Sequence, residues 1–248
     1  MKNRIFQILI NQNNSLLLPE PIKQITNDVI QYFPEYEYSL WGDSQIRELL
    51  QADFEPEVYN AYRSLAPFAY RSDLARYCLL YRFGGWYIDL GIQLAKQNVV
   101  SSISNDIEMI FFWDLGDLKA PYRSFYDCMN GLIYSKPNNP VLRKAIELVV
   151  GNCKSNYYGS DSMSPTGPGV FGRSIAIVGK SDKYYDGHFM QLTPQHDQKN
   201  KAYVMRTGEI FAWHRSHINS NMKDLSDFGI EGGNDYRNLW RDRKVYIQ

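Results

Sequence analysis

Two acids and an arginine stand close together in the segment 72–91, SDLARYCLLYRFGGWYIDLG. Asp73 and Arg76 are three residues apart, so they share one face of the amphipathic helix that the apolar spacing predicts. Asp89 follows a Gly-Gly pair, which is typical of a helix end, and stands in a run that alternates like a strand. The planar guanidinium of arginine can bond two oxygens at once. The helix and the strand therefore deliver a set of charges that suits a nucleotide and its diphosphate.

Each of these residues also has a plainer interpretation. Asp73 and Arg76 could form a solvated salt bridge on a helix surface, which stabilises a protein only weakly. Asp89 could merely form a turn or cap the element that follows it. Its neighbours are apolar, however, so a charge at this position needs a partner, and a divalent cation or nucleotide hydroxyls could serve.

The segment resembles glycosyltransferase family 32, which is named for a DxD sugar-nucleotide-binding region, and the related catalytic domains of glucosylating toxins. The family pattern is roughly S-D-x-x-R, then an apolar helix, then G-G-x-Y-x-D-x-D. The matching residues are Ser72, Asp73, Arg76, Gly84, Gly85, Tyr87 and Asp89. The chain departs from the pattern at Gly91, where the family usually has the second Asp. The stretches 34–43, 130–142 and 166–168 resemble further family segments.

The resemblance implies a GT-A-type α/β fold and a retaining glycosyltransferase with a nucleotide-diphosphate donor, a UDP-sugar being favoured. The implied acceptor is a glycan, and the implied role is in surface polysaccharide synthesis. Asp73 is expected to contact ribose or sugar hydroxyls, and Arg76 the sugar or the phosphates. Arg76 and Asp89 are the expected catalytic residues. The expected donor contacts are Ile8, Asp73, Arg76, Tyr87, Asp89, Asn130 and Gly167. A non-catalytic nucleotide-sugar-binding protein and a nucleotide-sugar hydrolase are the alternatives.

A divalent cation, Mn²⁺ or Mg²⁺, is the cofactor that the resemblance implies. Asp89 and His214 are its expected protein ligands, and the donor diphosphate would supply further oxygens. Because Gly91 removes the second acid, the cation could also be held by other residues, be held weakly or be unnecessary. His214 and His217 form an HxxH pair, but the further ligands of a recognisable zinc pattern are not evident.

The composition narrows the class of protein. The chain has 248 residues, 27 basic and 27 acidic side chains, and three scattered cysteines. Zero net charge gives no global field that favours nucleic acid, and these cysteines favour a reducing compartment. The apolar run 5–10 is too short to be a transmembrane segment. We therefore expect one cytoplasmic catalytic domain over residues 1–248, which could rest on the inner membrane face if its acceptor is a lipid-linked glycan.

The elements that must position these residues alternate along the chain. Strands are expected at 4–10, 36–41, 86–94, 107–113 and 132–134, and helices at 21–32, 43–50, 67–83 and 140–150. This alternation favours a mostly parallel central sheet flanked by helices. The Gly-, Ser- and Pro-rich stretch 152–172 is expected to be a long loop, in which Gly167 lets the backbone approach a sugar. The basic segment 237–244 could cover the diphosphate or could be a solvated helix face.

Overall fold

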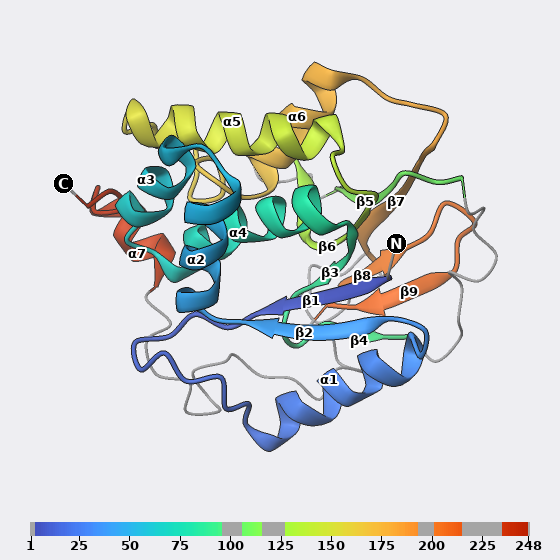
Figure 1. The fold of residues 1–248 in the computed structure, drawn as a ribbon. Coiled ribbons are helices and arrows are strands. Elements are labelled where there is room, and N and C mark those ends of the chain that lie inside the picture. The colour runs from blue at the N-terminus through green and yellow to red at the C-terminus, as the bar shows by residue number, and fades with distance from the viewer. Residues whose placement is uncertain (1–2, 96–105, 116–126, 193–200, 215–234, 248) are drawn as a thin grey trace.

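The structure is a computed structural model that describes residues 3–95, 106–115, 127–192, 201–214 and 235–247. In chain order the elements are β1 (Arg4–Ile8), α1 (Glu20–Tyr32), β2 (Glu37–Trp41), α2 (Asp43–Asp53), α3 (Pro56–Ser64), α4 (Phe68–Phe83), β3 (Gly85–Ile88), β4 (Gln93–Leu94), β5 (Met109–Asp114), β6 (Cys128–Ser135), α5 (Pro140–Lys154), α6 (Pro168–Val178), β7 (Tyr184–Gln191), β8 (Lys201–Val204), β9 (Ile210–Trp213) and α7 (Tyr236–Arg241). The described strands form one sheet in the order β2-β1-β3-β6-β5-β7-β8-β9-β4. Figure 1 shows α1 on one side of this sheet and α2 to α6 on the other.

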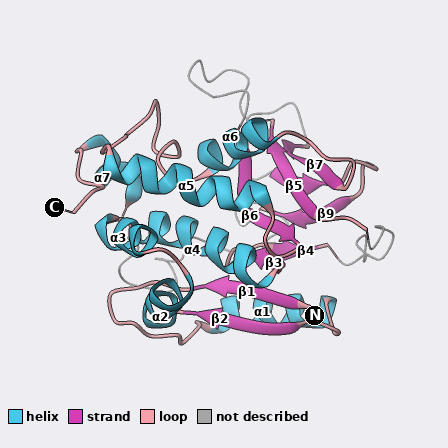
Figure 2. Cartoon of the chain, turned by 45° about the horizontal axis from the view of Figure 1, so that its top comes forward, coloured by secondary structure: helices cyan, strands magenta, loops and turns pink. Residues whose placement is uncertain are grey.

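The three N-terminal strands of the sheet run parallel and end at one edge. β1 lies between β2 and β3, so that Ile5 is paired with Tyr38 on one side and with Trp86 on the other. Helix α1 connects β1 to β2, and α2, α3 and α4 connect β2 to β3. Parallel strands need such crossovers, which cover the faces of the sheet with helices (Figure 2). The carboxyl ends of the three strands therefore meet at one edge, where ligands bind in open α/β sheets.

Two glycines let helix α4 turn directly into strand β3. Gly84, at φ 66°, ends the helix by donating its backbone N–H to the carbonyl oxygen of Leu80. Gly85 has φ 111°, and a Cβ atom there would lie only 2.3 Å from the carbonyl oxygen of Arg4. A glycine is thus required for β3 to approach β1 this closely. The Gly-Gly pair therefore fixes where α4 ends relative to the end of β3.

Alternate residues of the strands face two large apolar clusters. The side chains that face α2 to α6 include Phe6, Tyr87, Phe111 and Ile133. Those that face the other way, toward α1, include Ile5, Trp86, Ile88, Phe112 and Leu132. Because both faces are covered, these central strands are apolar almost without interruption, as buried strands are.

The expected α/β class, with a central sheet flanked by helices, is confirmed, but the sheet is mixed rather than mostly parallel. The pairs β1–β2, β1–β3 and β5–β7 are parallel, and the other five pairings are antiparallel. β7, β8 and β9 follow one another as an antiparallel meander at the C-terminal end of the sheet. Strand and helix alternation in the N-terminal half of the sequence carries no information about that part of the sheet.

The expected strand 86–94 is in fact two strands joined by a turn. β3 ends at Ile88, and the N–H of Ile92 closes a turn by donating to the carbonyl oxygen of Asp89 over 3.1 Å. β4 then pairs with β9 at the far end of the strand order. So few residues cannot span a flat sheet of this width, because each extends the chain by at most about 3.6 Å. The sheet therefore curls until its β4 end comes near Asp89.

The expected loop 152–172 also contains the ends of two helices. α5 continues to Lys154, and α6 begins at Pro168, with Gly167 as the residue that precedes its first turn. The Gly- and Pro-rich composition hid this helix start, although proline is favoured in the first turn of a helix. Helix α3 was not expected at all, although it too begins with a proline and buries Val58, Ala61 and Tyr62 at helical spacing.

Candidate functional site

Asp89 is a partly exposed acid at the carboxyl end of β3. Its backbone N–H donates to the carbonyl oxygen of Gly131 in β6 over 2.7 Å, which fixes the residue at the edge of the sheet. Its side chain is 42 % exposed, and Oδ1 lies 3.2 Å from Nη1 of Arg76. The same oxygen accepts a hydrogen bond from the hydroxyl of Tyr87 over 2.5 Å. Asp89 is thus an oriented carboxylate that solvent can reach.

Arg76 lies between the two acids and is buried, with 6 % of its side chain exposed. Nη2 lies 3.2 Å from Oδ1 of Asp73, so one guanidinium bridges Asp73 and Asp89. Nη1 donates to the carbonyl oxygen of Asn130 over 2.9 Å, and Nε donates to that of Ser72 over 3.1 Å. The guanidinium therefore makes its contacts within the protein, and the predicted contact of Arg76 with sugar or phosphate stays a prediction.

Burial and charge act on these groups in different ways. Burial by itself would lower the pKa of Arg76, but the neighbouring charge of Asp89 raises it, so the guanidinium stays charged. Burial raises the pKa of Asp73, although Arg76 opposes this shift. Burial also raises the pKa of Tyr87 well above its usual range, so that its hydroxyl stays protonated and donates to Asp89. The Tyr87 ring lies 4.5 Å from the guanidinium carbon, at a cation–π distance.

Asp73 is directed into the protein. Its Oδ1 accepts from Nδ2 of Asn130 over 2.8 Å, and its Oδ2 accepts from the hydroxyl of Thr166 over 2.7 Å. Nδ2 of Asn130 also donates to the hydroxyl of Tyr77 over 2.9 Å. Asp73 thus joins α4 to β6 and to the segment that precedes α6. Its predicted contacts with donor hydroxyls stay a prediction, as does the contact of Asn130.

Gly131 and Tyr203 also lie around Asp89, and sequence reasoning missed both. A Cβ atom at Gly131 would lie 2.6 Å from Oδ2 of Asp89 and 3.3 Å from the hydroxyl oxygen of Tyr203. Gly131 therefore leaves the space that the carboxylate occupies. The signal for Gly131 was a glycine within a strand-forming run, which often marks a close approach. The local sequence gives no such signal for Tyr203, because it arrives from β8.

His214 comes to the same end of the sheet because the sheet is curled. It follows Trp213, which pairs with Gln93 in β4, and only residues 90–92 separate Gln93 from Asp89. The ring of His214 packs against that of Phe189, with centroids 5.3 Å apart. The topology is therefore compatible with the predicted metal role of His214, which stays a prediction.

Ile8 and Gly167, which were predicted donor contacts, and Gly91, which replaces the second acid of the family pattern, lie beside the two acids. Continuing the β1–β3 register from its last pair places Ile8, which is 6 % exposed, beside Asp89. Gly91 is buried at φ 89°, in the turn after Asp89. A Cβ atom at Gly167 would lie 3.3 Å from Oδ2 of Asp73. Gly167 thus adjoins the buried acid, and its predicted role as a donor contact stays a prediction.

The described residues offer few ligands to a divalent cation. Among them, no three His, Cys, Asp or Glu side chains come together as a metal site would require. Asp89 supplies one accessible carboxylate, which fits beside Gly131 because no side chain stands there. Such a set fits a cation that takes most of its oxygens from a diphosphate and water. His217 lies outside the described residues.

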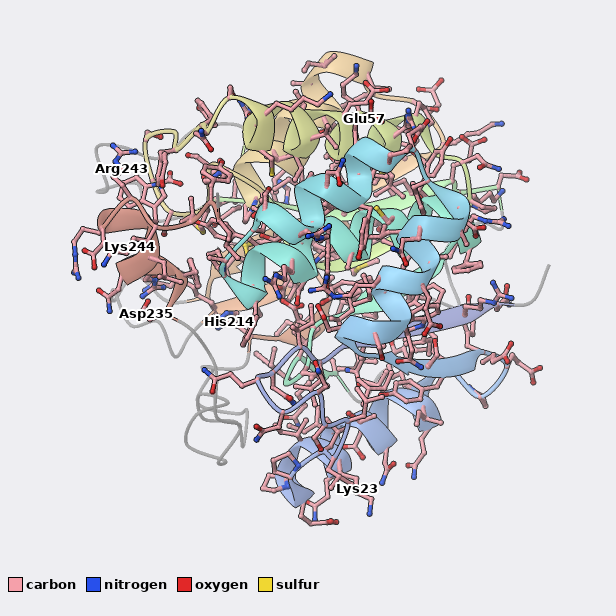
Figure 3. The ribbon with its side chains drawn as sticks, turned by 60° about the vertical axis from the view of Figure 1, so that its left-hand side comes forward. Lys23, Glu57, His214, Asp235, Arg243 and Lys244 are labelled. Atoms are coloured by element: carbon pink, nitrogen blue, oxygen red, sulfur yellow. The ribbon has the colours of Figure 1, made fainter. Side chains whose placement is uncertain are left out.

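The basic C-terminal segment packs on aromatic rings. The guanidinium carbon of Arg243 lies 4.4 Å from the ring centroid of Tyr158 and 5.7 Å from that of Trp240. Figure 3 labels Arg243 and Lys244 at the edge of the molecule. Figure 1 shows α7 on the side toward which β1 and β2 point. The segment therefore lies toward the edge that carries Asp89, and its predicted role over the diphosphate stays a prediction.

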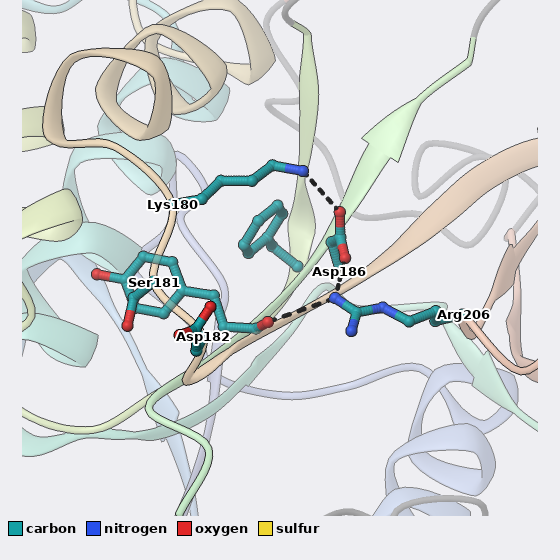
Figure 4. A pocket seen from close by; sticks show the side chains of 7 residues that line it. Lys180, Ser181, Asp182, Asp186 and Arg206 are labelled. Atoms are coloured by element: carbon teal, nitrogen blue, oxygen red, sulfur yellow. Dashed lines mark hydrogen bonds and ion pairs between the residues drawn. The ribbon is translucent and has the colours of Figure 1, made fainter.

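A pocket of about 250 Å³ lies elsewhere, where β7 begins (Figure 4). Asp186 at its wall accepts from Lys180, Arg206 and the indole of Trp113. Burial alone would raise the pKa of Asp186, but these hydrogen bonds lower it to about 2. The strand register places this pocket at the edge of the sheet where β3 starts, opposite to Asp89. It is therefore separate from the group around Arg76.

The comparisons with known proteins agree with the sequence resemblance. Residues 19–109 match a family described as the glycosyltransferase sugar-binding region containing the DXD motif. An uncharacterized glycosyltransferase of Acanthamoeba polyphaga mimivirus is 28 % identical over 139 residues, which are 56 % of this chain and 51 % of that protein. Inositol phosphoceramide mannosyltransferase 3 of Schizosaccharomyces pombe is 34 % identical over 96 residues, which are 34 % of this chain and 27 % of that protein.

The fold has a solved counterpart. The structure of PaToxG glycosyltransferase superposes with a TM-score of 0.53 and 19 % identity, over 71 % of this chain and 68 % of that one. The resemblance to glycosyltransferase family 32 and to toxin glycosyltransferases is thereby confirmed, and a transferase is supported. The matches to the two curated relatives span about half and about a quarter of their lengths. Residues 19–109, which include Asp73, Arg76 and Asp89, therefore match the glycosyltransferase sugar-binding region containing the DXD motif, and the fold is similar to that of a solved glycosyltransferase.

Proposed function

We propose that this chain is a glycosyltransferase that moves a sugar from a nucleotide-diphosphate donor, a UDP-sugar in the first place, to a glycan or lipid-linked glycan acceptor. The observation that carries the proposal is the placement of Asp89. Its carboxylate is reachable from solvent, is oriented by Arg76 and Tyr87, and stands at the carboxyl end of parallel strands. Ligands of open α/β sheets bind outside this edge.

The charge of the group supports the use of a cation. When both acids are ionised, Asp73, Asp89 and Arg76 together carry one net negative charge, and Arg76 is already shared between the acids. A diphosphate that approaches Asp89 directly would be repelled, whereas a divalent cation between them would attract both. We therefore propose that Asp89, with His214 as a second candidate ligand, holds Mn²⁺ or Mg²⁺ together with the donor diphosphate. Such a cation would neutralise the charge that develops on the leaving phosphate.

We propose that transfer retains the anomeric configuration. The bond between the anomeric carbon and the diphosphate oxygen breaks, and the acceptor oxygen bonds to that carbon from the same face. The acceptor proton passes to the departing phosphate, so this step needs no nucleophile from the protein. The residues of the chain then bind and orient: Tyr87 and Arg76 hold Asp89 in place, and Ile8 and Gly91 border it.

The proposed acceptor rests on the names of two relatives. Two relatives are named inositol phosphoceramide mannosyltransferases, so their printed acceptor is a lipid that carries a polar headgroup. None of the helices in the part of the chain that the structure describes has the length and apolar character needed to cross a bilayer. We propose peripheral contact with a membrane surface for the case of a lipid-linked acceptor. A cytoplasmic location and a role in surface polysaccharide synthesis remain parts of the proposal.

A donor screen tests the proposal directly. Melting temperature is measured with UDP, GDP and their sugar conjugates, with Mn²⁺ or EDTA, for the natural chain and for Asp89→Asn. We expect a nucleotide-dependent rise with Mn²⁺, because a ligand that binds only the folded state stabilises it. Affinity in Asp89→Asn should fall by about tenfold or more, since a contact to a charged group is lost. Asp53→Asn is the control, because Asp53 pairs with Arg82 at the surface.

The outcomes separate the classes of protein. Sugar transfer to an added glycan or glycolipid supports the transferase. Release of free sugar irrespective of acceptor would identify a hydrolase, and tight donor binding with no turnover would identify a binding protein. If no nucleotide shifts the transition at millimolar concentration, the donor-site assignment is wrong.

A further inference from the structure

Thr166 is a buried threonine whose side chain and backbone both bind helix α4. It is 0 % exposed, and its hydroxyl donates to Oδ2 of Asp73 over 2.7 Å. Its carbonyl oxygen accepts from the hydroxyl of Tyr77 over 3.0 Å. Gly167 follows, and a Cβ atom there would lie 3.3 Å from Oδ2 of Asp73, so a larger residue would require its neighbours to move by a few tenths of an ångström. The segment that ends at Thr166 is therefore fixed against the acid of α4.

The contacts continue from Asp73 to the exposed carboxylate. Oδ1 of Asp73 lies 3.2 Å from Nη2 of Arg76, and Nη1 of Arg76 lies 3.2 Å from Oδ1 of Asp89. Asn130 acts on both links, because its side chain donates to Asp73 and its carbonyl oxygen accepts from Arg76. Only the last member of this series is substantially exposed. A change at Thr166 can therefore reach Asp89 through two ionic contacts.

We propose that Thr166 is a positioning residue for the nucleotide-binding carboxylate: by holding Asp73, it fixes Arg76 and thereby Asp89. The inference rests on the proposed function for its consequence, namely donor affinity, but not for its geometry. The two hydrogen-bond donors hold the Asp73 carboxylate in one favoured orientation. The buried guanidinium of Arg76 pairs with this carboxylate and is oriented by it in turn. Removing one donor leaves an under-bonded charge in a buried place. Asp73 then has more than one arrangement, and so do Arg76 and Asp89.

The residue types support positioning over simple space filling. A buried contact that served only packing would be satisfied by valine, which has the same shape as threonine without the hydroxyl. Serine lacks the methyl group but keeps the hydroxyl. The two substitutions therefore separate the hydroxyl from the volume. Ser174 in α6 provides a matched control, because it is equally buried and its hydroxyl donates to the carbonyl oxygen of Val170, away from Asp73.

The experiment compares Thr166→Val, Thr166→Ser and Ser174→Ala. UDP affinity with Mn²⁺ is measured by calorimetry, and the Nε–H signal of Arg76, which donates to Ser72, is followed by nuclear magnetic resonance. Thr166→Val should weaken UDP binding about tenfold, which corresponds to about 1.4 kcal/mol. It should also shift or broaden the Arg76 signal. Thr166→Ser and Ser174→Ala should keep UDP affinity and the Arg76 signal close to those of the natural chain.

Asp73→Asn completes a double-mutant cycle. If Thr166 acts through Asp73, adding Thr166→Val to Asp73→Asn should weaken UDP binding little further, whereas independent effects would add. In Asp73→Asn the buried charge is replaced by a neutral amide, so the loss of the threonine hydroxyl should cost less stability. The double variant can therefore be measured if Thr166→Val alone does not fold. Additive losses, or a Thr166→Val protein that loses stability but keeps UDP affinity and the Arg76 signal, would overturn the proposal.

The geometry and the function fail separately. If the natural chain binds no nucleotide diphosphate, the proposed function is wrong, and the Arg76 signal alone decides the inference. An Arg76 signal that changes in Thr166→Val and not in Thr166→Ser supports the positioning role even then. An unchanged signal in both variants refutes it.

Discussion

Arg76 is a buried cation whose neighbours are themselves charged or polar. Its side chain is 6 % exposed and contacts two carboxylates, two backbone carbonyl oxygens and an aromatic ring. A buried charge of this kind is stable only because its partners replace the water that it has lost. The same reasoning applies to Asp73, whose nearest cation is Arg76. Deleting the Arg76 side chain would therefore change the stability of the protein and the position of Asp89 together.

We therefore predict that Arg76→Ala lowers the free energy of unfolding strongly. Breaking a buried pair leaves an uncompensated charge, so the loss should be about 3–5 kcal/mol. Arg82→Ala on the same helix removes a pair whose arginine is 51 % exposed, and it should cost less than about 1 kcal/mol. Urea unfolding of both variants measures the difference. Adding Asp73→Asn to Arg76→Ala should restore part of the loss, since the stranded charge is then removed. Equal, small losses in both arginine variants would mean that Arg76 is solvated.

At the scale of elements, the turn after β3 explains why the sequence could predict Asp89 but not its setting. Leu90, Ile92 and Leu94 continue the alternation of the strand, so the pattern predicts one strand over 86–94. In the structure Leu90 packs with Ile22 and Ile25 of α1 in a small separate cluster, whereas Ile92 and Leu94 belong to the large cluster that also contains Ile5 and Trp86. The alternation persists because the side chains are buried in different places. Periodicity reports burial and does not report which element provides it.

Other elements were predicted because their signals are local. α4 and its Gly-Gly end, and the charged residues that α4 and β3 carry, follow from spacing and from the conformational range of glycine. The partners of those charges do not, because Thr166 and Tyr203 come from segments far along the chain. Propensity and periodicity describe a segment, whereas the site is made where segments meet.

The turn leads to a prediction for Gly91→Asp, the substitution that would restore the family's second acid. Gly91 has φ 89°, a conformation that costs other residues roughly 1–2 kcal/mol. We expect the variant to be less stable by about 1 kcal/mol, because aspartate tolerates positive φ better than most residues. Mn²⁺ affinity without nucleotide should increase only if the turn can relax. Chemical unfolding and Mn²⁺ titration measure the two effects.

Gly151→Asp is the matched control for that substitution. Gly151 lies in α5, and a Cβ atom there would have no heavy atom within 4 Å. Its stability should therefore change little, and its Mn²⁺ affinity should not change. A Gly91→Asp protein as stable as the natural chain would show that the backbone at this position does not require glycine.

At the scale of the whole molecule, the C-terminal segment joins parts that are distant in sequence. The indole Nε1 of Trp240 donates to the backbone carbonyl oxygen of Tyr158 over 2.7 Å. The hydroxyl of Tyr246 donates to the backbone carbonyl oxygen of Tyr157. Tyr246 also forms a bridge with Leu65, in the connection between α3 and α4. The segment that begins at Tyr157 continues to Thr166, whose hydroxyl donates to Asp73. The C-terminal segment therefore supports, at one remove, the segment that reaches the buried acid.

We predict that Trp240→Phe loosens the segment 157–166 while the rest of the fold persists. Phenylalanine keeps an aromatic ring but cannot donate to Tyr158, so the loss should be about 1 kcal/mol. For a chain of this size, that corresponds to a fall in melting temperature of about 2–4 °C. Amide hydrogen exchange should accelerate in 157–166 and stay unchanged in α1, because local openings follow local contacts. Trp41→Phe is the control, since it loses an indole hydrogen bond to Ser39, only two residues away. Acceleration of 157–166 in both variants would point to a general loss of stability, and no acceleration in Trp240→Phe would show that the segment holds its position without the C-terminal contact.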